Sequence, residues 1–306
     1  MPHKLYIIGS GAIGKALAVF LTHQQREVVL IRGSSDDGTH YQEKIELTLS
    51  DHTNLVAEVE VDSLRNHPVL EGVVILTNKS FGNQKLASAL KGRLHAPLVI
   101  LQNGLGVEQP FIDNGFQDVY RCVLFATSQI TDNGKLRFKP VAVSPVGIIK
   151  GDERTLNAVV NSITTPVFQF RAEQDIQLFI WKKAITNSVF NSICTLFEVD
   201  NGIFHRNEEA MRLAKRIVKE CVAIAQQSGV QLQEQDVVDS ILLISNSSDG
   251  QLISTLQDIR NKRETEIDML NFEFVRIAGK SGRADQITET NLLGELVKIK
   301  SDLNRR

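Results

Sequence analysis

Apolar and polar positions follow two different patterns along this chain. In the first half, short β-branched runs alternate with stretches of helical periodicity, which is typical of βαβ units around a parallel sheet. The predicted strands are residues 5–8, 27–31, 73–77, 98–102 and 120–126. Residues 14–23 and 83–90 are predicted to be crossover helices. Alternation over residues 128–151, around a turn at residues 132–134, predicts antiparallel strands, so we expect a doubly wound sheet with a hairpin extension.

The second half of the chain has long helical periodicity and no convincing strand. The predicted helices are residues 175–198, 207–228, 251–258 and 264–279. The pattern changes near residues 170–174. We therefore predict an α/β domain over residues 1–172, followed by an all-helical domain over residues 173–306.

The composition excludes several classes of protein. The 306 residues include 34 Lys and Arg against 36 Asp and Glu, with no long block of one sign, so no nucleic-acid-binding surface is expected. The longest apolar runs, such as residues 72–76 and 97–101, are far shorter than the roughly 20 residues of a membrane-spanning helix. The strand-like start also leaves no room for a targeting segment.

The cysteines and histidines indicate neither disulfides nor a metal site. Cys122, Cys194 and Cys221 are too few and too widely spaced for a disulfide framework, so reduced thiols and a cytoplasmic location are expected. The seven histidines occur singly, without the close pairs that bind metals. The sequence therefore predicts no catalytic metal.

A glycine-rich segment directly follows the first predicted strand and precedes the first helix. It consists of Gly9, Ser10, Gly11, Ala12, Ile13 and Gly14. In a Rossmann-type domain the first glycine permits the tight turn, the second lets the backbone approach a pyrophosphate, and the third lets the helix pack on the strand. This context predicts dinucleotide binding; the alternative is a tight turn with no ligand.

Arg32 follows the second strand, at the position that distinguishes the two nicotinamide dinucleotides. A basic residue there pairs with the extra phosphate of NADP, whereas an acid binds the ribose hydroxyls of NAD. Arg32 therefore favours NADPH. Two alternatives stay open: Arg32 is only a solvated surface residue, or Asp36 or Asp37 serves NAD instead.

Two further residues follow the third and fourth strands of the predicted parallel sheet. Lys79 comes after the strand at residues 73–77, and Asn103 after the strand at residues 98–102. Because ligands bind outside the carboxyl ends of parallel strands, both are candidates for the cofactor site. The alternatives are a solvated charge for Lys79 and turn chemistry for Asn103.

A polar stripe marks the first long helix of the second half. Lys183, Asn187 and Asn191 are four residues apart on a helix that is otherwise mostly apolar. Buried amides and ammonium groups need partners, so this stripe is a candidate binding surface; a solvated face is the alternative. Reduction of a ketone by hydride leaves an alkoxide that an acid must protonate, and Lys183 is the candidate acid, with Lys182 as the alternative.

Together these segments resemble the ketopantoate reductase (2-dehydropantoate 2-reductase) family over nearly the whole chain. The resemblance rests on the glycine segment, Arg32, Lys79, Gln102-Asn103-Gly104, the lysine and asparagine helix, and two later motifs. These later motifs are Ser254-Thr255-Leu256-Gln257-Asp258 and Thr265-Glu266-Ile267-Asp268, from which the pattern alone selects no functional residue. One departure is Asn78, which stands before Lys79 where the family usually has an apolar residue.

The resemblance implies a role for each matching residue. Lys183 is the general acid, and Glu266 binds substrate or assists proton transfer. The residues implied to hold the substrate's carboxylate and hydroxyls are Asn103, Asn187, Asn191 and Ser254. Arg32 and Lys79 face NADPH, and the site lies between a Rossmann domain and a helical domain.

The expected function is NADPH-dependent reduction of 2-dehydropantoate to pantoate, a step of pantothenate and coenzyme A biosynthesis. Reduction of another branched 2-oxo acid, or a non-catalytic dinucleotide-sensing role, are the alternatives. The expected partners are a small 2-oxo acid and NADPH, and a homodimer is possible; no nucleic acid, membrane or metal is expected.

Overall fold

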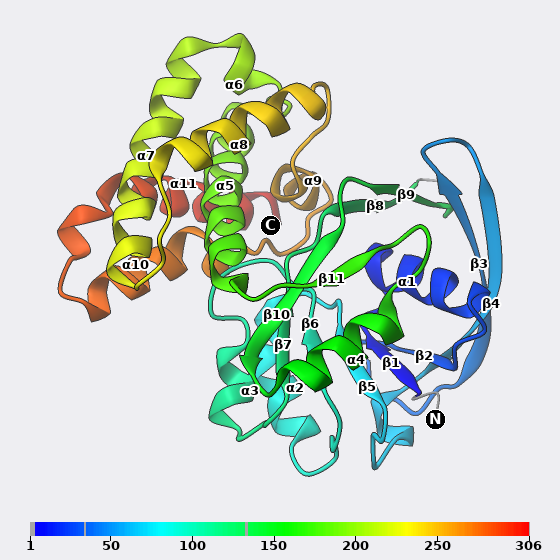
Figure 1. Cartoon of the computed structure of the whole chain (residues 1–306). Coiled ribbons are helices and arrows are strands. Elements are labelled where there is room, and N and C mark those ends of the chain that lie inside the picture. The colour runs from blue at the N-terminus through cyan, green and yellow to red at the C-terminus, as the bar shows by residue number, and fades with distance from the viewer. Residues whose placement is uncertain (1–3, 34, 132–133, 306) are drawn as a thin grey trace. The chain divides into compact units, whose positions relative to one another are not determined.

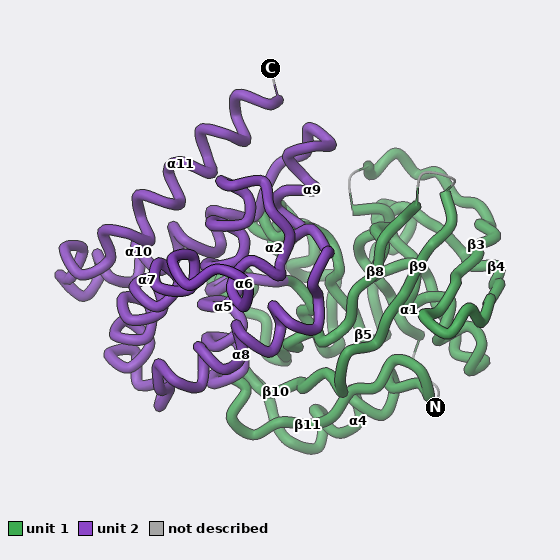
Figure 2. The backbone as a smooth tube through the Cα atoms, turned by 90° about the horizontal axis from the view of Figure 1, so that it is seen from above, with its two compact units in different colours: residues 1–102, 107–176 green, residues 103–106, 177–306 purple. Residues whose placement is uncertain are grey.

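The computed structural model describes residues 4–33, 35–131 and 134–305, and they form two compact units (Figure 2). The first unit comprises residues 1–102 and 107–176, and the second comprises residues 103–106 and 177–306. The predicted fold class, a Rossmann-type α/β region followed by a helical region, is confirmed. The short segment 103–106 belongs to the helical unit, although both of its neighbours in sequence belong to the sheet unit.

All eleven strands formed by the described residues lie in one sheet (Figure 1). In chain order they are β1 (Leu5–Ile8), β2 (Val28–Ile31), β3 (Tyr41–Leu49), β4 (Asn54–Asp62), β5 (Val73–Leu76), β6 (Leu98–Ile100), β7 (Val119–Cys122), β8 (Ala126–Ile130), β9 (Leu136–Pro140), β10 (Ser144–Lys150) and β11 (Phe170–Ala172). Their order across the sheet is β11-β10-β7-β6-β5-β1-β2-β4-β3-β9-β8. The neighbours from β7 to β4 are all parallel.

The order of the parallel strands reverses at β1. From β1 the chain adds β2 and then β4 on one side, and it returns to place β5, β6 and β7 on the other. In doubly wound sheets, ligands bind at such a switch point, outside the carboxyl ends of the strands. The segments that follow β1 and β5 are therefore the positions where this topology places a ligand.

The central strands are short and wholly apolar on both faces. Every residue of β1, β2 and β5 is buried. Strands covered on both faces of a parallel sheet have such continuous apolar runs. This is why the sequence predicted these strands, with β1 at the same residues and β2 and β5 differing by a residue at one end.

The hairpin of β3 and β4 was not predicted from the sequence. Strand β3 lies in the connection between the parallel strands β2 and β4, where a βαβ unit would have a helix. Exposed and charged residues alternate with buried ones along both strands. The predicted antiparallel extension is confirmed by the pairing of β8 with β9; residues 132 and 133 of its predicted turn lie outside the described residues.

Helices connect the strands and pack on the sheet. They are α1 (Ala12–His23), α2 (Asn83–Leu90), α3 (Gln109–Asp113) and α4 (Glu153–Ile163). The predicted helix at 83–90 is confirmed as α2, and α1 begins two residues before its predicted start. Phe20 of α1 contacts Phe138 edge to face with ring centroids 4.9 Å apart, and Phe168 at 6.1 Å. These ring contacts join α1 to β9 and to the segment that precedes β11.

Among its described residues, the second unit forms helices and connecting loops and no strand. Its α-helices are α5 (Ile176–Phe197), α6 (Ile203–Arg206), α7 (Glu208–Gln227), α8 (Glu234–Ser247), α9 (Ser254–Arg260), α10 (Asn271–Lys280) and α11 (Thr288–Arg305). The helix α5 contributes to two aromatic contacts of the core. Trp181 contacts Phe274 of α10 at a centroid distance of 5.7 Å, and Phe190 contacts Phe204 of α6 at 4.7 Å.

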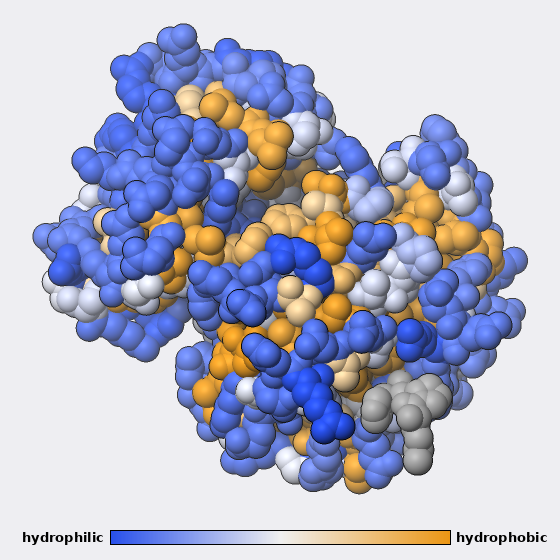
Figure 3. Space-filling model, in the orientation of Figure 1, coloured by the Kyte–Doolittle hydropathy of each residue, from blue (hydrophilic) through white to orange (hydrophobic). Residues whose placement is uncertain are grey.

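The surface matches the mixed composition of the chain. Figure 3 shows hydrophilic residues over most of the helical unit on the face seen, as expected for helices that bury only one side. Among the described residues, no helix is both long and apolar enough to cross a membrane.

Candidate functional site

The glycine segment connects β1 to α1, and its three glycines have different surroundings. Gly9 has a φ of +123°, and a Cβ there would lie 2.4 Å from the backbone nitrogen of Asn78. A Cβ on Gly14 would lie 1.9 Å from the carbonyl oxygen of Gly9. By contrast, a Cβ on Gly11 would have no neighbour within 4 Å. Packing therefore requires glycine at the first and third positions, while the second faces open space.

This arrangement fits a dinucleotide. The open side of Gly11 is at the amino end of α1, and the first turn of α1 contains no acidic residue. The first backbone N–H groups of a helix have no intrahelical partner, and the helix dipole favours an anion beside them. The segment from Gly9 to Gly14 can therefore accept a pyrophosphate close to the backbone.

The segment after β5 lies against the glycine segment. The Thr77 hydroxyl donates to the carbonyl oxygen of Gly9 at 2.9 Å, and the Asn78 backbone nitrogen donates to that of Ile8 at 3.1 Å. These bonds connect the carboxyl ends of β1 and β5 at the switch point. Lys79, the next residue, is exposed and precedes the 3₁₀ helix η2 (Ser80–Gly82).

Two buried amide side chains, those of Asn83 and Gln102, hold the segment that follows β5. The Gln102 Nε2 donates to Asn83 Oδ1 at 2.9 Å, and Asn83 Nδ2 donates to Gln102 Oε1 at 2.7 Å. Gln102 Nε2 also donates to the carbonyl oxygen of Asn78 at 2.9 Å. The amide of Gln102 therefore holds the backbone at Asn78, the residue at which the chain departs from the family pattern. Sequence reasoning missed this pair because nothing in the sequence connects positions 83 and 102.

Arg32 follows β2, as predicted, and forms an ion pair with Asp37. Its side chain is 17% exposed, and Nη2 also lies 3.4 Å from the carbonyl oxygen of Thr39. The hydrogen bond from Arg32 holds the pKa of Asp37 well below its ordinary value. Asp37 therefore remains charged at neutral pH and competes with any phosphate for Arg32.

Asp36, the other acidic alternative, is bonded elsewhere. Its Oδ1 accepts hydrogen bonds from Ser63 Oγ and from the Arg65 backbone nitrogen, both at 2.6 Å. The Ser63 hydroxyl lowers the pKa of Asp36. Asp36 would have to give up both bonds to reach a ribose.

In the helical unit, α5 carries the predicted polar stripe. Lys183 and Asn187 are half-buried, and Asn191 is 3% exposed. The Oδ1 of Asn191 accepts a hydrogen bond of 3.4 Å from the Thr255 backbone nitrogen. This bond brings the end of the stripe to the first turn of α9, whose first residue, Ser254, is exposed. A wholly solvated stripe does not match these burials.

Asn103 is also in the helical unit, in the short segment 103–106. The next residue, Gly104, has a φ of +100°, and a Cβ there would lie 2.6 Å from the carbonyl oxygen of Met269. The Leu105 backbone nitrogen donates to the same oxygen at 3.0 Å. Met269 ends the 3₁₀ helix η3 (Ile267–Met269), and half-buried Glu266 comes directly before it. The predicted residues Asn103 and Glu266 are thus in segments that contact each other.

The predicted residues therefore fall into two groups. The first unit contains the glycine segment, Arg32 and Lys79, at the carboxyl ends of β1, β2 and β5. The second unit contains the remaining residues, which are Asn103, Lys183, Asn187, Asn191, Ser254 and Glu266. Lys182, the alternative acid, is half-buried like Lys183.

The comparisons with known proteins agree on one family. Residues 5–142 match the family described as "Ketopantoate reductase PanE/ApbA", and residues 175–300 match "Ketopantoate reductase PanE/ApbA C terminal". A 2-dehydropantoate 2-reductase of Pyrococcus abyssi (strain GE5 / Orsay) is 26% identical over 287 residues, covering 90% of this chain and 91% of that protein.

Two solved structures have the same fold as this chain. A PanE/ApbA family ketopantoate reductase from Ralstonia eutropha JMP134 has a TM-score of 0.84 at 22% identity, covering 99% of this chain and 100% of the other. A D-mandelate dehydrogenase with NADH and anilino(oxo)acetate has a TM-score of 0.83 at 21% identity, with the same coverage. At these identities the two likenesses show a shared fold.

Proposed function

Because the chain belongs to the ketopantoate reductase family, we propose that it reduces 2-dehydropantoate to pantoate with NADPH, a step in pantothenate and coenzyme A biosynthesis. The chain is an oxidoreductase of the ketopantoate reductase type, and its family uses a nicotinamide dinucleotide. The substrate and the choice of NADPH over NADH are the proposal. The cytoplasmic location and the homodimer stay predictions.

The surroundings of the glycines are the observation that carries the cofactor proposal. Gly9 and Gly14 are enclosed by backbone, whereas Gly11 faces open space at the start of α1. Residues 9–14 would hold the pyrophosphate, Arg32 would pair with the 2′-phosphate, and Lys79 and Asn103 would contact the remainder of NADPH. When bound, NADPH supplies the hydride. We assign this binding to the domain of residues 1–172.

The helical domain, residues 173–306, would hold the substrate together with Asn103 and would supply the proton. Asn103, Asn187, Asn191 and Ser254 offer amide and hydroxyl groups for the carboxylate and hydroxyls of a small acid. The Lys183 ammonium would donate its proton to the oxygen of the reduced ketone, which becomes a hydroxyl. Glu266 would bind the substrate or assist this proton transfer.

The proposal is tested by following NADPH oxidation at 340 nm with purified protein and ketopantoate. We expect saturable oxidation with ketopantoate and one equivalent of pantoate formed per NADPH consumed. NADH in place of NADPH serves as the cofactor control. No oxidation above background, from protein that binds NADPH and is folded by circular dichroism, would reject the substrate.

Reduction of a different 2-oxo acid is the second candidate function. It is favoured by the shared fold with a D-mandelate dehydrogenase, an enzyme named for another 2-hydroxy acid. A panel of ketopantoate, branched 2-oxo acids without a 4-hydroxyl, and benzoylformate distinguishes the candidates. A site that hydrogen-bonds the 4-hydroxyl of ketopantoate should reject acids lacking it by a factor of about 10⁴, since its polar groups would be left unpaired.

Replacing Arg32 with alanine should change the cofactor preference. Loss of the charged hydrogen bond to the 2′-phosphate should lower NADPH affinity about 10- to 100-fold, while NADH affinity changes little. Asp37→Asn is the matched variant and should raise NADPH affinity, because it removes the carboxylate that competes for Arg32. Dissociation constants from nicotinamide fluorescence provide the measurement. An equal loss for both cofactors in Arg32→Ala would contradict the assignment.

A further inference from the structure

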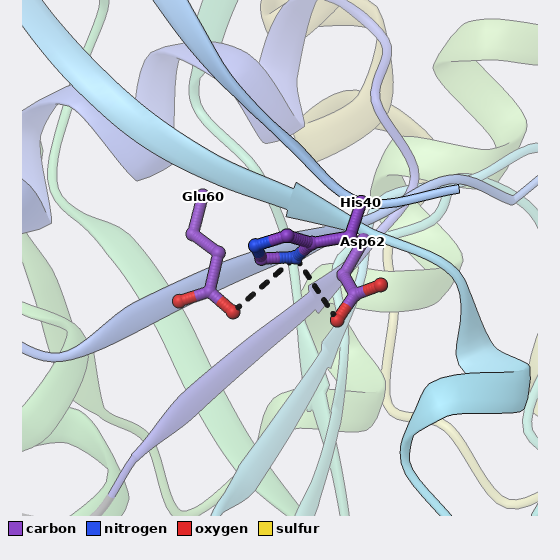
Figure 4. A group of neighbouring side chains, drawn as sticks. All are labelled: His40, Glu60 and Asp62. Atoms are coloured by element: carbon purple, nitrogen blue, oxygen red, sulfur yellow. Dashed lines mark ion pairs between the residues drawn. The ribbon is translucent and has the colours of Figure 1, made fainter. Parts of the chain in front are cut away.

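A histidine and two carboxylates gather at the open end of the β3–β4 hairpin, where β3 begins and β4 ends beside β2. Figure 4 shows the imidazole of His40 between the carboxylates of Glu60 and Asp62. His40 Nδ1 lies 3.9 Å from Glu60 Oε1 and 3.5 Å from Asp62 Oδ2. One ligand atom from each of the three residues lies within 4.8 Å of the other two.

The register of the hairpin places these side chains together. Tyr41 pairs with Val61 in the antiparallel ladder, so the preceding residue, His40, is opposite Asp62. Glu60 is two residues before Asp62 and therefore points to the same face of the sheet. The sequence predicted no metal because its histidines form no close pairs. Here the histidine and the carboxylates meet across the hairpin: His40 directly precedes β3, and Glu60 and Asp62 of β4 follow it 20 and 22 residues later in the chain.

We propose that His40, Glu60 and Asp62 bind a divalent transition-metal ion of the zinc type, with water completing the coordination. Imidazole nitrogen and carboxylate oxygen are both ligands of Zn²⁺, at about 2.0–2.2 Å. Tetrahedral ligands at those lengths are about 3.3–3.6 Å from one another. The separations of 3.5 and 3.9 Å are therefore close to those of a bound site, and rotation of exposed side chains would close the difference.

The buried member of the set is fixed in place before any ion binds. Asp62 is 5% exposed, and its Oδ1 accepts hydrogen bonds from the Ser63 backbone nitrogen at 2.7 Å and from Asn66 Nδ2 at 2.6 Å. His67 Nε2 lies 2.9 Å from Oδ2. Groups behind a metal ligand orient it in this way and raise affinity. The other two ligands, His40 and Glu60, are on the solvent side and provide a route for the ion.

The charges of the cluster also favour a cation. Glu60 and Asp62 bring two carboxylates onto one face, with the imidazole between them. Like charges at this separation repel unless a cation is present. The positive groups nearby have other partners as well: Lys4 forms an ion pair with Glu27 at 3.2 Å, and Arg32 forms one with Asp37. A divalent ion bound between the two carboxylates would offset their repulsion.

The proposed site is connected to Arg32 through the loop that begins at Arg32 and ends at His40. The Arg32 backbone nitrogen donates to the carbonyl oxygen of Asp62 at 3.0 Å. Asn66 Nδ2 also donates to the carbonyl oxygen of Gly38 at 3.0 Å. An ion that joins His40 to β4 would therefore hold both ends of the loop against the same strand.

Metal binding is tested on the full-length protein after removal of any affinity tag and treatment with a chelator. Titration calorimetry with ZnCl₂ should show one high-affinity site per chain. His40→Asn and Glu60→Gln should each weaken it by more than about tenfold, since even groups behind a ligand contribute about 10- to 100-fold. Mg²⁺ at millimolar concentration should not compete, because it prefers an all-oxygen octahedral site. Anomalous diffraction at the zinc edge should show a peak beside His40 Nδ1.

His52→Asn is the matched control. His52 is exposed in the turn between β3 and β4 and has a φ of +67°, which asparagine tolerates. This variant should bind Zn²⁺ like the wild type. The proposal would be overturned if the wild type binds no Zn²⁺, if His40→Asn binds Zn²⁺ as tightly as the wild type, or if Mg²⁺ displaces the Zn²⁺. Because the readout is metal binding, the result is independent of the reductase assay.

Discussion

Replacing Lys183 with alanine is expected to lower kcat by about 10²- to 10⁴-fold, the usual contribution of a positioned general acid. NADPH binding should be retained, because Lys183 is in α5 of the helical unit and the glycine segment is in the sheet unit. Stopped-flow measurement of hydride transfer and fluorescence titration of NADPH separate the two effects.

Two further variants distinguish proton donation from charge. Lys183→Arg keeps the positive charge, but an arginine does not release its proton near neutral pH, so kcat should remain low. Lys182→Ala is the matched control, since Lys182 is adjacent on α5 and equally half-buried, and its kcat should stay within a few-fold of wild type. Full turnover in Lys183→Ala together with loss in Lys182→Ala would transfer the role to Lys182.

Gly14→Ala is expected to destabilise the protein and abolish NADPH binding. Alanine is ordinarily favoured over glycine in a helix by about 1 kcal/mol. Here, however, its Cβ would lie 1.9 Å from the Gly9 carbonyl oxygen and 2.6 Å from Thr77 Oγ1. Overpacking of this kind costs about 1–3 kcal/mol or more, and a backbone atom cannot move aside by changing rotamer. The free energy of unfolding in urea should therefore fall.

Gly11→Ala is the matched variant, because it adds the same methyl group where no atom lies within 4 Å. Its φ of −77° suits alanine, so stability should equal that of the wild type or exceed it slightly. Only the approach of a ligand to the backbone is obstructed. NADPH affinity should fall by about tenfold or more, which corresponds to about 1.4 kcal/mol. Wild-type affinity in Gly11→Ala would show that the pyrophosphate binds elsewhere.

The parts of the fold that follow from local sequence could be predicted. The buried strand before Gly9 and the glycine spacing depend on neighbouring residues, so β1 and the start of α1 were predicted to within two residues. The spacing of Lys183, Asn187 and Asn191 is likewise a property of one helix. These features need no knowledge of distant contacts.

The parts that depend on pairing between distant segments could not be predicted. The charged residues of β3 and β4 make both segments resemble a solvated loop in sequence. Only the pairing of the two strands shows that exposed residues alternate with buried ones. Asn83 and Gln102 are ordinary polar residues in sequence, and their reciprocal hydrogen bonds depend on the positions of α2 and β6. His40 and Asp62 are brought together in the same way by the hairpin register.

The short segment 103–106 has a consequence for how the chain acquires its structure. Leu105 and Gly104 are synthesised long before Met269, the residue that accepts the Leu105 hydrogen bond and encloses Gly104. Contacts between residues so far apart in sequence form late, because the intervening chain must first be ordered. During synthesis the sheet unit would therefore emerge with this segment still without its partner. Asn103 would take its native position only when the carboxyl-terminal helices arrive, so a chain shortened before η3 would lack a finished site even with its sheet intact.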